Sequence, residues 1–136
     1  MHSDFKSNNI LQMKCNSILY GITCLFVFAG CKQDDQTLKS QIEGTWDVFA
    51  SEMNNKPNNF MQDAWFDFSK DSKVQSNLFE NQKELKYEIN RGKLSIDIPD
   101  GFSMNIERLT NDTLVLEGKL KYYYMEYFLV KRKVAQ

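Results

Sequence analysis

The stretch LKYEINRGKLSIDI, residues 85–98, decides the fold class of this chain. Every second residue is apolar on both sides of the turn signal Arg91-Gly92. Alternation with a period of two is typical of a strand that has one buried and one solvated face. A two-residue turn between two such runs predicts an antiparallel hairpin.

The same alternation runs through most of the chain, with turn signals about every 8–12 residues, as in sandwiches and barrels. Because short connections favour antiparallel pairing of neighbours, eight strands in this order can close and leave no exposed edge. We therefore predict an all-β fold, an eight-stranded antiparallel up-and-down meander preceded by a helical turn. The predicted turn covers residues 37–43, and the predicted strands are 44–52, 64–69, 73–79, 83–90, 93–98, 102–109, 113–118 and 121–131.

Composition excludes several chemistries. The 136 residues carry a formal net charge of -1, so charge gives no reason to expect a nucleic-acid partner. The only histidine is His2, and the three cysteines all lie within residues 1–31. The rest of the chain therefore cannot form a Ser-His-Asp triad, a Cys-His pair, a His-ligated zinc site or a disulfide. We expect no metal, no cofactor and no enzymatic activity.

The N-terminus has the features of an export signal. Residues 18–30 form a mostly apolar run, which has the length of a signal-peptide core and is short for a membrane span. We predict a signal peptide at residues 1–30. Because Met13-Lys14 has the form of a natural start, residues 1–12 can also be interpreted as a start-site misassignment. An uncleaved anchor or a buried helix is the alternative.

Phe28-Ala29-Gly30-Cys31 resembles a bacterial lipobox, in which the cysteine is acylated after cleavage. The resemblance implies a lipoprotein attached to the membrane through lipidated Cys31, since several acyl chains give a firm anchor. We expect residues 31–41 to be the lipidated cysteine and a flexible tether. The expected location is the bacterial cell envelope, as an outer-membrane lipoprotein on the periplasmic face or the cell surface.

Gly44-Thr45-Trp46 opens the first predicted strand and fits the Gly-x-Trp start of lipocalins. With the lipobox and the strand order, most of residues 42–131 resemble the lipocalin-like lipoproteins of Bacteroidetes, and we predict a lipocalin-like barrel domain at residues 42–136. The resemblance implies a barrel that Trp46 plugs at one end, with the loop 53–63 at the other. It also implies a basic residue that covers the tryptophan, for which Lys131 and Arg132 are equal candidates.

Two readings of the barrel interior are open at the level of sequence: side chains fill it, or it holds one small ligand. The candidates for lining such a cavity are Trp46, Phe66, Phe68, Tyr87, Met104, Tyr123, Met125 and Tyr127. The long loop 53–63 carries two apolar residues, Phe60 and Met61. They are lid candidates over a cavity mouth, or else residues of a plain loop tucked into the core.

The leading functional interpretation is a membrane-anchored binding protein for a small hydrophobic or amphipathic ligand. The alternative is a protein-interaction module without a cavity, acting as an accessory subunit of an envelope complex or an inhibitor of an attacking enzyme. The tyrosine run 122–124 bears on this choice, because neighbouring residues of a strand face opposite sides and some rings must point outward. Exposed rings suit an interface, although aromatic residues are also ordinary sheet material.

Overall fold

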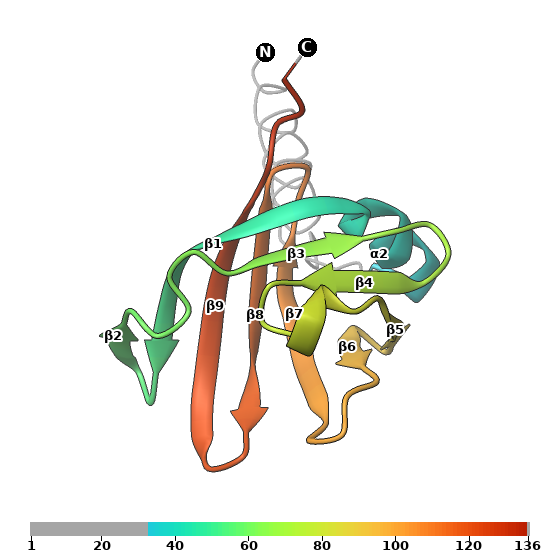
Figure 1. The fold of residues 1–136 in the computed structure, drawn as a ribbon. Helices are drawn as coiled ribbons and strands as arrows, with labels where there is room; N and C mark the ends of the chain where they lie inside the picture. Colours follow the sequence, from blue (N-terminus) through green and yellow to red (C-terminus); the bar gives the residue numbers. More distant parts are fainter. Residues whose placement is uncertain (1–32, 136) are drawn as a thin grey trace, which may run out of the picture. The chain divides into compact units, whose positions relative to one another are not determined.

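The computed structural model describes residues 33–135, which form one α-helix and nine strands (Figure 1). A short 3-10 helix, η1 (Glu80–Gln82), lies between β4 and β5. The other elements are α2 (Asp35–Ile42), β1 (Gly44–Met53), β2 (Lys56–Asn58), β3 (Trp65–Phe68), β4 (Lys73–Ser76), β5 (Leu85–Asn90), β6 (Lys93–Ile96), β7 (Phe102–Leu109), β8 (Thr113–Leu120) and β9 (Tyr123–Lys131). The predicted signal peptide and Cys31 lie outside the described residues.

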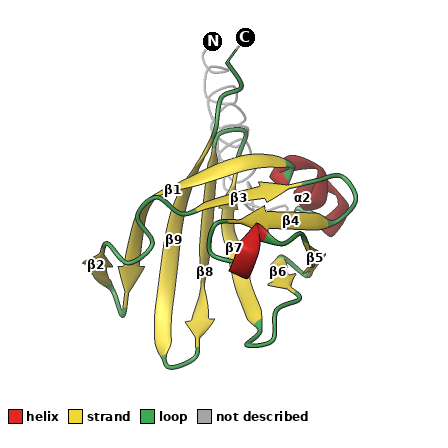
Figure 2. Ribbon diagram, viewed as in Figure 1, coloured by secondary structure: helices red, strands yellow, loops and turns green. Residues whose placement is uncertain are grey.

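The strands form a closed antiparallel barrel. Their order in the sheet is β2-β1-β3-β4-β5-β6-β7-β8-β9, and β1 also pairs with β9, which closes the ring. β2 pairs only with β1 and projects from the ring (Figure 2), so the pairing leaves eight strands in the barrel. The predicted eight-stranded up-and-down meander is therefore confirmed.

The extra strand β2 lies within the loop 53–63. Asn54 and Asn55 both have positive φ, 53° and 61°, which is the backbone of a two-residue hairpin turn, and asparagine tolerates it better than most residues. Pro57 lies on this outer strand, opposite Glu52. A proline is tolerated on an edge strand because its far side has no neighbouring strand to which a backbone N–H would have to donate. Part of the segment predicted as the long loop 53–63 is therefore a hairpin.

Helix α2 is longer than the predicted turn and belongs to the barrel domain. Asp34 caps its N-terminus by accepting a hydrogen bond from the Thr37 N–H at 2.8 Å. Leu38 and Ile42, four residues apart on one face, are both buried in the barrel core. The packed domain thus begins at α2, and the part of the expected tether 31–41 from Asp35 onward is helix.

Two β-bulges set which side chains face inward. One lies on β1 between Val48 and Ala50, and the other on β7 between Ile106 and Arg108. Because a bulge adds one residue, the alternation along β1 shifts: Val48 and Ser51 are buried, while Phe49 is 64% exposed.

Residues 33–136 form one compact unit with its own hydrophobic core, so this part of the chain has what a domain needs to fold alone. Within residues 33–135 no helix is long and apolar enough to cross a membrane.

Candidate functional site

The end of the barrel next to α2 is closed by Trp46. Its indole Nε1 donates a hydrogen bond to the Ile42 carbonyl at 2.7 Å, which satisfies a carbonyl at the end of α2. The Nζ atom of Lys131 lies 5.1 Å from the Trp46 ring centroid and donates to the Gln41 carbonyl at 3.4 Å. The basic residue that covers the tryptophan is therefore Lys131, while Arg132 pairs with Asp47 on the outer face.

Gly44 is required by the same arrangement. Its φ is +116°, a conformation that residues with a side chain rarely adopt. A Cβ atom at this position would lie 2.9 Å from Cε of Lys131. The glycine of the Gly-x-Trp pattern thus leaves room for the lysine to pass over the barrel end and reach Trp46.

Aromatic side chains occupy the barrel interior. Phe66 on β3 and Phe102 on β7 are not on neighbouring strands, yet their ring centroids are 6.1 Å apart, so they meet across the barrel. Phe66 also stacks on Phe68 at 6.2 Å, and Phe68 meets Tyr87 edge-on at 5.1 Å. These rings are core side chains packed on one another.

Seven of the eight cavity candidates are buried and belong to the same hydrophobic core. They are Trp46, Phe66, Phe68, Tyr87, Met104, Met125 and Tyr127. Tyr123 is 49% exposed; it pairs with Leu120 at the β8–β9 turn, at the rim of the barrel. The structure thus brings the set together as packing, with Tyr123 outside it.

The two lid candidates have opposite environments. Met61 is buried in the core, whereas the side chain of Phe60 is 87% exposed. The backbone N–H of Phe60 donates to the Asn58 side-chain oxygen at 2.8 Å. Met61 is therefore a core residue tucked under the loop, and Phe60 points away from it.

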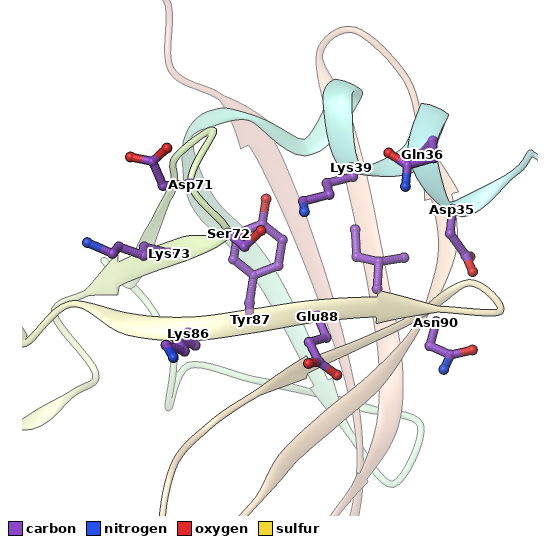
Figure 3. A pocket seen from close by; sticks show the side chains of 11 residues that line it. Asp35, Gln36, Lys39, Asp71, Ser72, Lys73, Lys86, Tyr87, Glu88 and Asn90 are labelled. Carbon is purple, nitrogen blue, oxygen red and sulfur yellow. The ribbon is translucent and has the colours of Figure 1, made fainter.

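A groove of about 460 Å³ lies between α2 and β5 (Figure 3). It opens where the barrel wall is least complete, because β4 and β5 pair only at Lys73–Lys86 and Val74–Leu85. One further hydrogen bond, from the Tyr87 N–H to the Ser72 carbonyl at 2.9 Å, marks the end of this contact. Beyond it β5 continues to Asn90 beside α2 without a β4 partner.

Two apolar residues of β5, Tyr87 and Ile89, form the floor of the groove, and the other nine lining residues are polar or charged. Tyr87 and Ile89 lie two residues apart on β5 and so share the face directed toward the barrel, where Ile89 packs on the core. Figure 3 shows the Tyr87 ring rising from β5 toward Ser72, and Lys86, Glu88 and Asn90 on the other side of the strand. Burial raises the pKa of the Tyr87 hydroxyl, and the Glu43 carboxylate adds to this, so the group stays protonated.

Charged side chains form the rim of the groove. Asp35 is already committed, because its two carboxylate oxygens accept the N–H groups of Arg91 and Gly92 at 2.8 and 2.9 Å. Lys73 is paired with Glu84 at 2.7 Å, and this pairing raises the pKa of the lysine. Lys39 extends from α2 over the space above β5 (Figure 3). Its ammonium takes part in no salt bridge among the described residues.

This groove was not predicted from the sequence, because Asp35 and Gln36 fall in the expected tether and Lys39 in its overlap with the expected helical turn. One local signal was available: Asp34 followed by Thr37 as a cap, with Leu38 and Ile42 spaced by four. The groove itself depends on α2 lying beside β5, about 50 residues further along the chain, which no local pattern encodes.

The outer face of the barrel carries a row of glutamates. Glu126 on β9 lies directly opposite Glu52 on β1 and Glu117 on β8. Partial desolvation, and then the charges of these two neighbours, raise the pKa of Glu126. Desolvation and a hydrogen bond with Glu117 likewise raise the pKa of Glu107. Among the residues that the structure describes, no cluster of acidic side chains has the arrangement of a metal site.

The tyrosine run is exposed at the β8–β9 turn and on this face. Tyr122 is the most exposed of the three, at 88%. The Tyr124 hydroxyl donates to a Glu117 carboxylate oxygen at 2.6 Å, and this bond raises the pKa of Tyr124 to about 12. On the same outer face Phe49 and Phe128 lie with their ring centroids 6.3 Å apart.

A closed eight-stranded antiparallel barrel, plugged at one end by a tryptophan under a helix, defines a class of small barrels related to the lipocalins. The chain belongs to the lipocalin-like domain family, whose model matches residues 42–116, more than half of the chain. It is similar to a solved lipocalin-like protein from Bacteroides uniformis ATCC 8492, with a TM-score of 0.52 and 12% sequence identity. That similarity covers 68% of this chain and 99% of the other, and supports the shared fold. No curated protein matches the sequence.

Proposed function

We propose that this protein is a lipid-anchored binding protein of the bacterial envelope, without enzymatic activity, that binds a small amphipathic molecule. The observation that carries the proposal is the groove between α2 and β5. Its volume of about 460 Å³ is within the range of small-molecule sites in proteins. It combines an apolar floor, Tyr87 and Ile89, with charged groups at its rim, which is the chemistry that suits an amphipathic ligand.

The packing of the barrel supports the groove as the ligand site in place of the barrel interior. A ligand inside the barrel would have to displace rings that touch across it, such as Phe66 and Phe102. Opening a packed core of this kind costs several kcal/mol for each large side chain. The groove needs no such rearrangement, because its two walls are a capped helix and a barrel strand.

The lipid anchor is supported by the sequence features around Cys31. Only residues 32–34 separate Cys31 from the start of α2 at Asp35. Fully extended, this link reaches at most about 14 Å, so a lipidated Cys31 would hold the groove close to a membrane surface. We expect the protein on the outer membrane, at its periplasmic face or on the cell surface.

Native mass spectrometry tests the binding proposal. Residues 33–136 are purified without detergent from the periplasm of a bacterial host and sprayed under native conditions. We expect a co-purified molecule of discrete mass, or a mass shift when fatty acids are added. A mass that equals the bare chain under both conditions would refute ligand binding.

The anchor is tested separately on the full chain. We expect a tryptic peptide that begins with acylated Cys31 and a membrane-bound protein, while a Cys31→Ala variant should stay unprocessed. An unmodified Cys31 in the mature protein would contradict the lipoprotein assignment.

A second candidate function is a protein-interaction module, and the exposed aromatic residues of the outer face favour it. Phe49 and Tyr122 are 64% and 88% exposed, and large exposed rings are common at the centre of interfaces. A pull-down of envelope proteins by the anchored chain, compared with a Phe49→Ser variant, distinguishes this role. Loss of a partner on substitution would support it.

A further inference from the structure

We infer that the groove is selective for a single-chain anionic amphiphile, whose carboxylate or phosphate head pairs with Lys39 and whose chain lies over Tyr87 and Ile89. This inference rests on the proposed function, because it names the ligand class of the same groove. It is carried by three observations: the unpaired cation at the rim, the commitment of the nearby acidic group, and the apolar floor.

Lys39 is the cation of the groove that is available to a ligand. It lies one helical turn after Asp35, the carboxylate with which it would ordinarily pair along the same helix face. Asp35 instead accepts two backbone N–H groups of the β5–β6 turn, which fixes its carboxylate toward that turn. Lys73 is neutralised by Glu84, and Lys86 lies on the far side of β5 (Figure 3).

Three other acidic residues belong to the surroundings of the groove: Asp71 and Glu88 line it, and the Glu43 carboxylate acts on the Tyr87 hydroxyl. Figure 3 places Glu88 on the opposite side of β5 and Asp71 at the end of the groove beside Lys73. Ser72 and Tyr87 line the same groove as Lys39, and Tyr87 remains protonated. Lys39 is the cation that α2 presents to the groove, so a ligand head that lies beside α2 pairs best when it is negative.

The volume and the floor limit the rest of the ligand. A water molecule occupies about 30 Å³ of liquid, so the groove has room for roughly fifteen non-hydrogen atoms. Ile89 is half-buried and packs on the core, while Tyr87 is almost fully buried beside it. Because removing apolar surface from water is favourable, a chain of about ten carbons that covers the exposed part of Ile89 gains affinity that a free anion does not.

The test uses decanoate as the probe, binding to residues 33–136 at low ionic strength by calorimetry. Lys39→Glu should weaken decanoate binding by about tenfold or more, as expected for the loss of a charge-assisted contact. The same variant should strengthen the binding of decyltrimethylammonium, which has the same chain and the opposite charge. Lys119→Glu, an exposed charge reversal on β8 outside the groove, is the matched control and should change neither affinity.

The outcomes separate the inference from the proposed function. If decanoate binds equally well to the parent chain and to Lys39→Glu, the inferred head-group contact is wrong although the protein still binds amphiphiles. If acetate or inorganic phosphate binds as tightly as decanoate, the groove is a site for free anions and the amphiphile assignment is wrong. If neither amphiphile binds the parent chain, the proposed function itself fails.

Discussion

Substituting Gly44 by alanine tests the explanation of the closed barrel end. The new Cβ would have to tolerate a φ of +116°, and would lie 2.9 Å from Cε of Lys131. Holding a side chain in such a backbone conformation costs about 1–3 kcal/mol. Since the contacted atom is near the end of a flexible side chain, Lys131 can move aside, but its ammonium then leaves the Trp46 ring.

The loss of the lysine–tryptophan contact adds about 0.5–1 kcal/mol. We therefore expect Gly44→Ala to lower the free energy of unfolding by about 1.5–4 kcal/mol, a large part of the total stability of a domain of this size. Urea unfolding of residues 33–136, followed by tryptophan fluorescence, measures this change.

A double-mutant cycle separates the two contributions. In a Lys131→Met background, which keeps an apolar stem but has no charge, Gly44→Ala should cost about 0.5–1 kcal/mol less than in the parent chain. A loss below 0.5 kcal/mol for Gly44→Ala, or strictly additive effects, would refute the explanation of the glycine.

Three further predictions follow from individual contacts. Met61→Ala should lower the free energy of unfolding by about 2–4 kcal/mol, because it leaves a cavity in the core. Phe60 is the exposed neighbour of Met61, and Phe60→Ala should change the urea midpoint little. Equal effects of the two substitutions would contradict these environments. Asp35→Ala should lower the free energy of unfolding by about 1–2 kcal/mol, because it removes the acceptor of two turn N–H groups. Amide hydrogen exchange at Arg91 and Gly92 should then accelerate. Unchanged exchange would argue against the contact. The pKa of Glu126 is raised in the folded state, so stability should fall as the pH rises from below the ordinary value of 4.5 through the raised pKa. Glu126→Gln should therefore stabilise the protein at pH 7 and not at pH 3. A gain that is the same at both pH values would be inconsistent with this assignment.

The barrel could be predicted because its information is local. Alternation with a period of two, as in Leu85, Tyr87 and Ile89, marks each strand and its buried face, and short turns leave little freedom in pairing. The role of Trp46 was instead implied by the resemblance of Gly44-Thr45-Trp46 to the Gly-x-Trp start of lipocalins. The bulge after Val48 could not be predicted from the local pattern. One extra residue reverses which side chains of the following part of β1 face inward, and only the pairing with β9 shows where that residue is inserted.

Other features depend on contacts between distant parts of the chain. Lys131 and Arg132 are adjacent and both basic, and only the register that places Lys131 opposite Trp46 distinguishes them. Phe60 and Met61 are likewise equivalent in sequence, and the path of the loop decides which one enters the core. Helix α2 has eight residues, of which only Leu38 and Ile42 are buried, so its polar composition resembles that of a linker.

We propose that a ligand binds between α2 and β5 and not inside the barrel. Nuclear Overhauser contacts between the chain of bound decanoate and methyl-labelled residues 33–136 locate the ligand directly. We expect contacts to the Ile89 methyl groups, with a shift of the Lys39 resonances. Contacts to Met104 and Met125, in the barrel interior, with none to Ile89, would contradict it.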